Sequence, residues 1–184
     1  NGMFDDQFPL KIWQTGSGTQ TNMNVNEVIS NIGALKNGSE IGKNNPLHPN
    51  DDVNKCQSTN DTFPTAIQIS VAKEINNKLF YSIDKIYESL ESKKEAWKSF
   101  IKIGRTHFQD AVPITYGQEI SAWSDQIKQS KESILKSMED LYQLPLGGTA
   151  VGTGINCPQT FSEKTISFIS CLLYTSPSPR DRQE

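Results

Sequence analysis

Three short segments of this chain gather hydroxyl, amide and imidazole side chains, the groups that bind small oxygen-rich anions. They are residues 15–24, residues 48–55 with 58–61, and residues 104–110. Hydroxyls and amides donate hydrogen bonds to an anion, and the free N–H groups and dipole of a helix start attract the same kind of ligand. The composition of the three segments therefore indicates a site for a small anion.

The two histidines differ in their surroundings. His107 is flanked by Thr106, Gln109 and Asp110. Histidine is the side chain that most readily exchanges a proton near neutral pH, so His107 is the candidate general acid or base. His48 stands between prolines and acids, where a surface position in a loop is the simpler expectation.

Each segment also has a purely structural interpretation. Residues 58–61 are N-cap residue types followed by Pro64 in the first turn, which predicts the start of a helix. Residues 15–24 fit a turn and a cap for a helix that begins at Asn24. The glycine-rich residues 146–154 match neither a dinucleotide-binding nor a Walker pattern, so they indicate close backbone approach or positive φ. A Gly-x-Ser-x-Gly elbow and a Cys–His couple are both lacking, which disfavours covalent acyl chemistry.

Helices must position these segments. Apolar residues recur three or four apart over residues 67–90, which predicts a helix of roughly 28 residues. A second long helix is expected over residues 120–141, after an irregular connection at 104–117. Shorter helical segments are expected at 24–34 and 161–170. Two long amphipathic helices need partners for their apolar faces, so the predicted fold is mainly α, a helical bundle with these apolar residues in its core.

Charge and cysteine content narrow the class of protein. The 184 residues carry 18 lysines and arginines against 21 aspartates and glutamates, a net charge of −3. This balance argues against a basic field for nucleic acid and against a polybasic membrane segment, and no apolar run is long enough to span a membrane. Cys56, Cys157 and Cys171 follow no disulfide or metal spacing, which favours reduced thiols in an intracellular protein without a metal site.

The ends of the chain differ from its middle. The chain does not begin with Met, so we expect its true start and any targeting peptide to be missing. Residues 172–184 are polar and without pattern, and resemble translated vector sequence. We expect a small N-terminal domain over residues 1–57, a helical-bundle domain over 58–171, and a non-native tail over 172–184.

The order and spacing of the polar segments resemble the class II fumarases of the fumarase/aspartase superfamily. The resemblance covers about residues 8–171. The matching strings are WQTGSGTQ (13–20), NMNVNE (22–27), HPNDDVNK (48–55), QSTNDTFP (57–64), KIGRTH (102–107), GQE (117–119) and LGGTAVGTG (146–154).

This resemblance implies a fumarase/aspartase-type fold and reversible addition of water to fumarate, giving (S)-malate, without metal or organic cofactor. His107 matches the histidine that transfers the proton of the water. The residues that match substrate-binding segments are Ser17, Gly18, Thr19, Ser58, Thr59, Asn60 and Thr106. A secondary dicarboxylate site is implied at His48, Pro49, Asn50 and Asp51.

The resemblance also implies a homotetramer whose active sites each draw on three chains. The charge balance and the lack of a long apolar run predict no nucleic acid or membrane partner. The compartment is expected to be the cytoplasm, with the mitochondrial matrix as the alternative. The family's mobile loop, a GSSxMPxKxNP segment that supplies the base-assigned serine and a substrate lysine, does not occur in this chain. We therefore expect a fragment truncated at both ends that is inactive and poorly folded by itself.

Two other functions compete with the hydratase. Aspartate ammonia-lyase shares the fold, but usually carries glutamine where this chain has His107. It also lacks the motif WQTGSGT of residues 13–19. His107 and this motif therefore both favour water over ammonia as the nucleophile. A non-catalytic helical module, as in crystallins recruited from this superfamily, is the alternative from a different class of protein.

Overall fold

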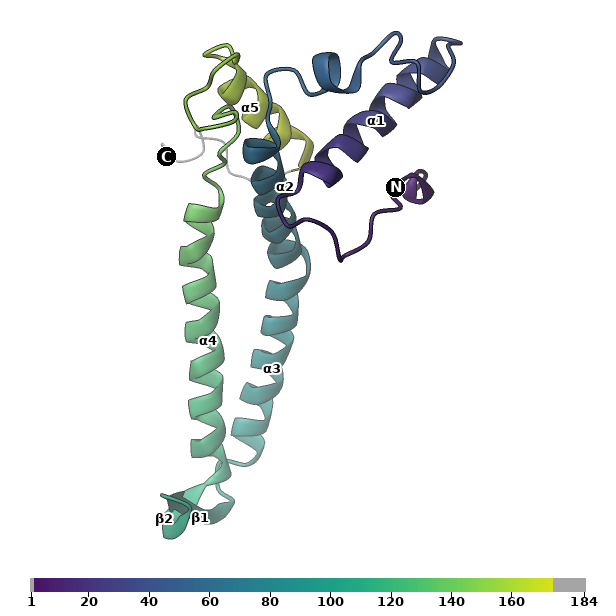
Figure 1. Cartoon of the computed structure of the whole chain (residues 1–184). Coiled ribbons are helices and arrows are strands. Elements are labelled where there is room, and N and C mark those ends of the chain that lie inside the picture. The colour runs from purple at the N-terminus through teal and green to yellow at the C-terminus, as the bar shows by residue number, and fades with distance from the viewer. Residues whose placement is uncertain (1, 174–184) are drawn as a thin grey trace. The chain divides into compact units, whose positions relative to one another are not determined.

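A computed structural model describes residues 2–173, and its ordered elements are mostly helices (Figure 1). The elements are α1 (Thr19–Lys36), α2 (Thr59–Glu74), α3 (Phe80–Ala96), β1 (Ile101–Thr106), β2 (Gln109–Thr115), α4 (Tyr116–Leu141) and α5 (Phe161–Leu173), with short 3-10 or π turns at Asp5–Gln7, Pro49–Val53 and Ile75–Leu79. The predicted mainly α fold is confirmed. Among these described residues, no helix is both long and apolar enough to cross a membrane.

The chain divides into two compact units. The first comprises Asn1–Ile69 together with Leu144–Glu184, and the second is Ser70–Gln143. The domain limits expected at residues 57/58 and 171/172 stay a prediction. Most of the expected non-native tail, residues 174–184, lies outside the described residues.

The predicted first long helix is longer than expected. α2, the π turn Ile75–Leu79 and α3 follow one another without an intervening loop, from Thr59 to Ala96. Pro64 was expected in the first turn, but it is the sixth helical residue and lies in the second turn. The N-cap residue types before it span four positions, so the sequence does not mark which of them begins the helix.

In the second unit, α3 and α4 run side by side (Figure 1). α4 begins at a capping box, in which the Thr115 hydroxyl accepts from the Gln118 N–H and the Gln118 side chain accepts from the Thr115 N–H. A Cβ at Gly117 would lie 2.6 Å from the Lys98 Cα and 2.9 Å from the Lys94 carbonyl oxygen. Only glycine therefore allows α4 to start so close to the end of α3.

The irregular connection expected at residues 104–117 is wrong. β1 and β2 form an antiparallel hairpin in which Thr106 pairs with Gln109, so His107 and Phe108 are its two-residue turn. Both have positive φ, 49° and 61°. Such turns usually contain Asn or Gly, and the pair His–Phe carries no such signal. Pro113 in β2 also argues against a strand, but a two-stranded sheet has only edge strands, where proline is tolerated.

The apolar faces of α3 and α4 are only partly covered. Ile120 and Met138 are buried, whereas Ile86 is 50% and Trp123 is 49% exposed. The expectation that all of these residues lie in the core is therefore correct for the first pair and wrong for the second. Two helices bury only the faces that they turn toward each other, so part of each apolar face remains open in this chain.

Glu91 links α3 to α4 and generates the first prediction. Its carboxylate accepts hydrogen bonds from Lys94 and from the buried Ser124 hydroxyl. The bond from Lys94, and then that from Ser124, hold the pKa of Glu91 below its ordinary value of 4.5, although burial acts the other way. A carboxyl whose pKa is lowered on folding stabilises the folded state above pH 4.5, and this contribution is lost as the pH falls through the folded pKa.

In a longer protein that contains residues 1–171 and the helices that cover the α3–α4 pair, we expect Glu91→Gln to lower the thermal midpoint of the helical circular dichroism signal at pH 7 by a few degrees. The difference from the unsubstituted chain should shrink below about pH 4. Glu88→Gln is the matched control, because Glu88 on the same helix pairs with Lys85 at the surface. Equal effects of the two substitutions at every pH would contradict this account of Glu91.

Candidate functional site

The start of α2 is capped by its own side chains, as the sequence predicted. The Ser58 hydroxyl accepts a hydrogen bond from the Asn60 N–H at 3.3 Å, and the Asp61 carboxylate accepts from the Ser58 N–H at 2.9 Å. This reciprocal arrangement satisfies two of the N–H groups that a helix start leaves unpaired. Since Ser58 accepts from a backbone donor, its own O–H proton stays available to another acceptor.

Asp61 also ties the glycine-rich loop to this helix start. Its carboxylate is 2% exposed and accepts further bonds from Gly147 N–H (3.1 Å), Thr149 N–H (2.8 Å) and the Thr62 hydroxyl (3.1 Å). No cation within residues 2–173 forms an ion pair with it. Four hydrogen bonds therefore replace the water that a buried carboxylate loses. The Asn60 amide adds a second tie by donating to the Ala150 carbonyl at 2.8 Å.

Helix α1 starts earlier than expected, and without a side-chain cap. The prediction of a cap for a helix beginning at Asn24 is wrong, because α1 begins at Thr19 after Gly18, whose φ is 81°. A Cβ on Gly18 would lie 2.3 Å from carbon atoms of the Phe63 ring, so only glycine brings this helix start against α2. Thr19 consequently lies in the first turn of α1.

A cluster of amides joins α1 to α2. The Asn54 side-chain oxygen accepts from the amides of Asn22 at 3.2 Å and Asn26 at 3.1 Å. Asn22 also donates to the Thr59 hydroxyl at 3.0 Å. The Thr59 hydroxyl is thus bonded in the same way as that of Ser58. Its oxygen accepts from a nitrogen donor, and its O–H proton can point elsewhere.

These residues border a cavity of about 450 Å³ that is open to solvent, in the first unit. Its lining residues come from α1, the segment before α2, the start of α2 and the glycine-rich loop: Thr19, Met23, Asn50, Asn54, Lys55, Cys56, Gln57, Ser58, Thr59, Thr149, Ala150, Ile155 and Asn156. Lys55 alone among them carries a formal charge at neutral pH. Hydroxyl protons, a helix start and one lysine, with no carboxylate in the lining, suit an anionic ligand.

The structure brings some of the predicted site residues together at this cavity. Thr19, Asn50, Ser58 and Thr59 line it. The predicted residues Ser17, Gly18, Asn60, His48, Pro49 and Asp51 belong to the same unit but not to the lining.

Thr106 and His107 belong to the second unit, where they are exposed at the end of the β1–β2 hairpin. The segment was expected to give His107 an orienting partner. Within the described residues Asp110 instead pairs with Arg105 at 3.1 Å, and the His107 side chain makes no hydrogen bond. A hydrogen-bond partner for the imidazole would have to come from outside this part of the chain.

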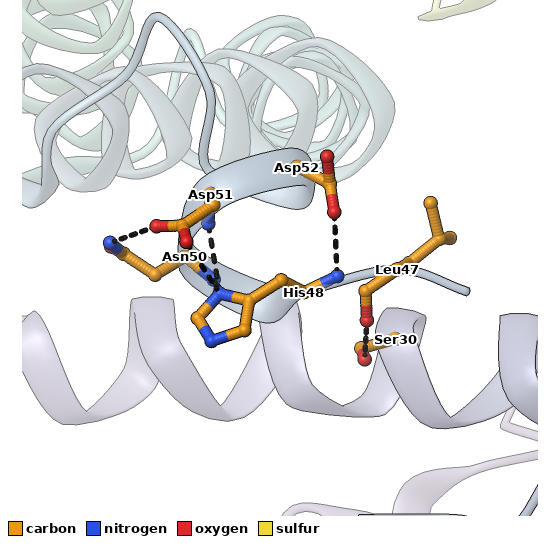
Figure 2. A network of polar contacts seen from close by, with 6 residues as sticks. All are labelled: Ser30, Leu47, His48, Asn50, Asp51 and Asp52. Carbon is orange, nitrogen blue, oxygen red and sulfur yellow. Dashed lines mark hydrogen bonds and ion pairs between the residues drawn. The ribbon is translucent and has the colours of Figure 1, made fainter. Parts of the chain in front are cut away.

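His48 caps the single turn Pro49–Val53 instead of lying loose in a loop (Figure 2). Its Nδ1 accepts from the N–H groups of Asn50 (3.3 Å) and Asp51 (3.1 Å), while the Asp52 carboxylate accepts from the His48 N–H at 2.8 Å. An Nδ1 that accepts is unprotonated, so the neutral ring carries its proton on Nε2. Ser30 of α1 donates to the Leu47 carbonyl at 2.5 Å, which anchors the turn to α1.

Asp61, Lys55 and Thr149 lie in segments that the sequence singles out, but the sequence assigned none of them a role at a binding site. Asp61 was expected only as part of the helix cap, and the carboxylate also holds the glycine-rich loop. Only the packing of distant segments places Lys55 and Thr149 on one cavity wall. Within the described residues, no group of three or more His, Cys, Asp or Glu side chains lies close enough to hold a metal ion.

Solved structures of known proteins share this fold. The solved structure of a class II fumarase from Schistosoma mansoni superposes with a TM-score of 0.85 and 46% sequence identity, over 94% of this chain and 37% of that chain. The fold is therefore that of the fumarase type of helical lyase. A family model described as "Lyase" matches residues 1–180, and the chain belongs to this family.

Curated relatives with similar sequences are also fumarate hydratases. The class II fumarate hydratase of Prochlorococcus marinus subsp. pastoris is 65% identical over 170 residues, which are 92% of this chain and 37% of the relative. The mitochondrial fumarate hydratase of Danio rerio is 51% identical over 172 residues, 94% of this chain and 34% of the relative. The chain thus spans about a third of the length of the curated relatives that it matches, in agreement with the predicted fragment.

Asp61 generates the second prediction. Asp61→Ala leaves the N–H groups of Ser58, Gly147 and Thr149 without their acceptor, so we expect a loss of about 2–4 kcal/mol in the free energy of unfolding. Urea titration of the helical circular dichroism signal measures the loss, in a chimera that carries residues 1–171 in place of the matching part of the Prochlorococcus hydratase. Asp51→Ala, which removes an exposed carboxylate on the neighbouring turn, is the control and should change little. A loss no larger than that of the control would show that Asp61 does not hold the loop.

Proposed function

We propose that this chain is part of a fumarate hydratase, which adds water reversibly to fumarate to give (S)-malate, and that the cavity at the start of α2 binds a carboxylate of the substrate. The 65% identity to the Prochlorococcus hydratase carries this proposal, because it extends over 92% of the chain. The chemistry of the cavity supports it independently of that relative's name.

The cavity wall suits a carboxylate. Ser58 and Thr59 accept hydrogen bonds from nitrogen donors, so each can direct its O–H proton at a ligand oxygen. The N–H groups at the start of α2 are mostly paired within its own cap, but the dipole of α2 still favours negative charge at the same place. Lys55 supplies one positive charge. These groups bind an anion through charge-assisted hydrogen bonds and need no metal to do so.

The proposed reaction needs donors that are in place before it starts. Removing a proton from malate next to a carboxylate creates an aci-carboxylate dianion, in which negative charge gathers on the carboxylate oxygens. Donors already oriented by other hydrogen bonds stabilise this charge without reorganising. The hydroxyls of Ser58 and Thr59 are oriented in this way.

His107 is proposed to exchange the proton of the water. Its side chain is exposed and without a hydrogen bond in the described part of the chain, so both ring nitrogens are accessible. Thr106 is proposed to bind substrate beside it. The positive φ of His107 and Phe108 places two bulky side chains where glycine is usual, a backbone strain found more often at functional sites than elsewhere.

Assembly into a homotetramer is proposed from the apolar surface. Ile86 and Trp123 stay about half exposed on the α3–α4 pair, together with Leu135. Helices with open apolar faces are covered by further helices in bundles, and copies of the same chain can supply them. The cytoplasm is the proposed compartment, because the relative at 65% identity is bacterial. The Danio relative supports the mitochondrial alternative.

The third prediction tests the activity itself. Residues 1–171 replace the matching part of the Prochlorococcus hydratase in a chimera, and fumarate hydration is followed by the loss of fumarate absorbance. We expect the chimera to hydrate fumarate and His107→Asn to lower its kcat by about 10²–10⁴, the usual contribution of a general acid or base. The 184-residue chain by itself should show no hydration.

Phe108→Asn is the matched control, since it changes the other residue of the same turn and asparagine tolerates positive φ. It should leave kcat within about threefold. A folded chimera that makes aspartate from fumarate and ammonium faster than malate would instead support the ammonia-lyase. A folded chimera with neither activity would support the non-catalytic module.

The fourth prediction concerns Lys55. Lys55→Met removes the one formal charge of the cavity lining, so we expect the KM of the chimera for fumarate to rise about tenfold while kcat changes less than threefold. The increase of KM with ionic strength should also become weaker. Lys43→Met, on an exposed residue of the same unit, is the control for net charge. An unchanged KM and salt dependence in Lys55→Met would exclude this role.

A further inference from the structure

The hydroxyl of Thr149 is the one buried side-chain polar group of the cavity lining that has no hydrogen-bond partner within residues 2–173. Thr149 is 6% exposed and lines the cavity, and its Oγ1 has no hydrogen-bond partner among the described residues. Buried hydroxyls are nearly always hydrogen-bonded, because one that is not loses its bonds to water without replacement. The missing partner therefore requires an explanation.

The backbone of Thr149 does not explain the side chain. Its φ is 56°, in the left-handed region that β-branched residues rarely adopt. The conformation is imposed from outside, because the Asp61 carboxylate accepts from the N–H groups of both Gly147 and Thr149. The Asn60 amide holds the next carbonyl, that of Ala150. Glycine or asparagine would suit this backbone better than threonine does.

We propose that Thr149 is a further carboxylate-binding residue of the cavity, whose O–H donates a hydrogen bond to an oxygen of the dicarboxylate. This inference rests on the proposed function and adds a residue to it. It accounts for both observations: a bound carboxylate supplies the missing acceptor, and the bonds from Asp61 and Asn60 hold the loop so that Thr149 stays in the wall. Thr149 then faces the same ligand as Ser58 and Thr59, from the loop side of the cavity.

Valine separates this role from a structural one. Thr149→Val keeps the β-branched shape and replaces the hydroxyl with a methyl group, so an unpaired hydroxyl predicts no loss of stability on substitution. A hydroxyl that bonds to the protein or to a structural water predicts the opposite. Thr149→Ser keeps the hydroxyl and removes the methyl group. Together the two variants assign any change in binding to one of the two groups.

The experiment uses the chimera and measures three quantities: the KM for fumarate, the inhibition constant of succinate, a dicarboxylate that does not react, and the thermal midpoint. For Thr149→Val we expect both constants to rise at least about tenfold, the effect of losing a hydrogen bond to a charged group. The thermal midpoint should stay the same or rise. Thr149→Ser should remain within about threefold of the unsubstituted chimera in both constants.

Two outcomes would overturn the inference. One is a Thr149→Val chimera with both constants within twofold of the unsubstituted protein. The other is a thermal midpoint that falls by several degrees in Thr149→Val and is restored in Thr149→Ser, which assigns the hydroxyl to structure. Thr149→Ala removes the same hydroxyl and is read in the same way if the valine variant does not fold. Hydration by the unsubstituted chimera tests the proposed function separately, so the two failures are distinguishable.

Discussion

The buried carboxylate of Asp61 is the interaction on which the first unit depends. One side chain caps the start of α2, through the Ser58 N–H, and holds the glycine-rich loop, through the N–H groups of Gly147 and Thr149. A carboxylate at a helix start is stabilised by the helix dipole and by its N–H donors, so it can be buried without a cation. Asp61 is not among the residues that line the cavity, so Lys55 is the one formally charged residue of the lining.

The hydroxyls that line the cavity are also fixed by hydrogen bonds within the protein. The Ser58 and Thr59 oxygens accept from the Asn60 N–H and the Asn22 amide, which leaves their O–H protons for a ligand. The amides of Asn22, Asn26 and Asn54 hydrogen-bond to one another, and Asn22 also donates to Thr59. Hydroxyls held in this way discriminate by hydrogen-bond direction, since an acceptor ligand satisfies them and a donor ligand competes with bonds already made.

Local patterns account for what the sequence predicted well. The cap at Ser58, the long apolar periodicities and the mainly α fold follow from residues within one or two helical turns of each other. The start of α1 was missed because its N-cap is Gly18, which makes no side-chain bond. The hairpin was missed because its turn is His–Phe, whose positive φ values are imposed by the fold and are not preferred by the residues. The positions of Lys55 and Thr149 on one wall are set by tertiary contacts, which no local pattern contains.

The contact between Asp61 and Thr149 joins residues that are 88 positions apart, and the whole second unit lies between them in the chain. This order has a consequence for synthesis on the ribosome. At about 5–20 residues per second, several seconds pass between the appearance of the carboxylate and that of its last donors. During that interval the start of α2 has its local cap, but the glycine-rich loop that Asp61 binds has not yet been made. The hairpin and the α3–α4 pair can already form, because their contacts are closer in sequence. The cavity at the start of α2 is therefore completed later than the hairpin and the α3–α4 pair.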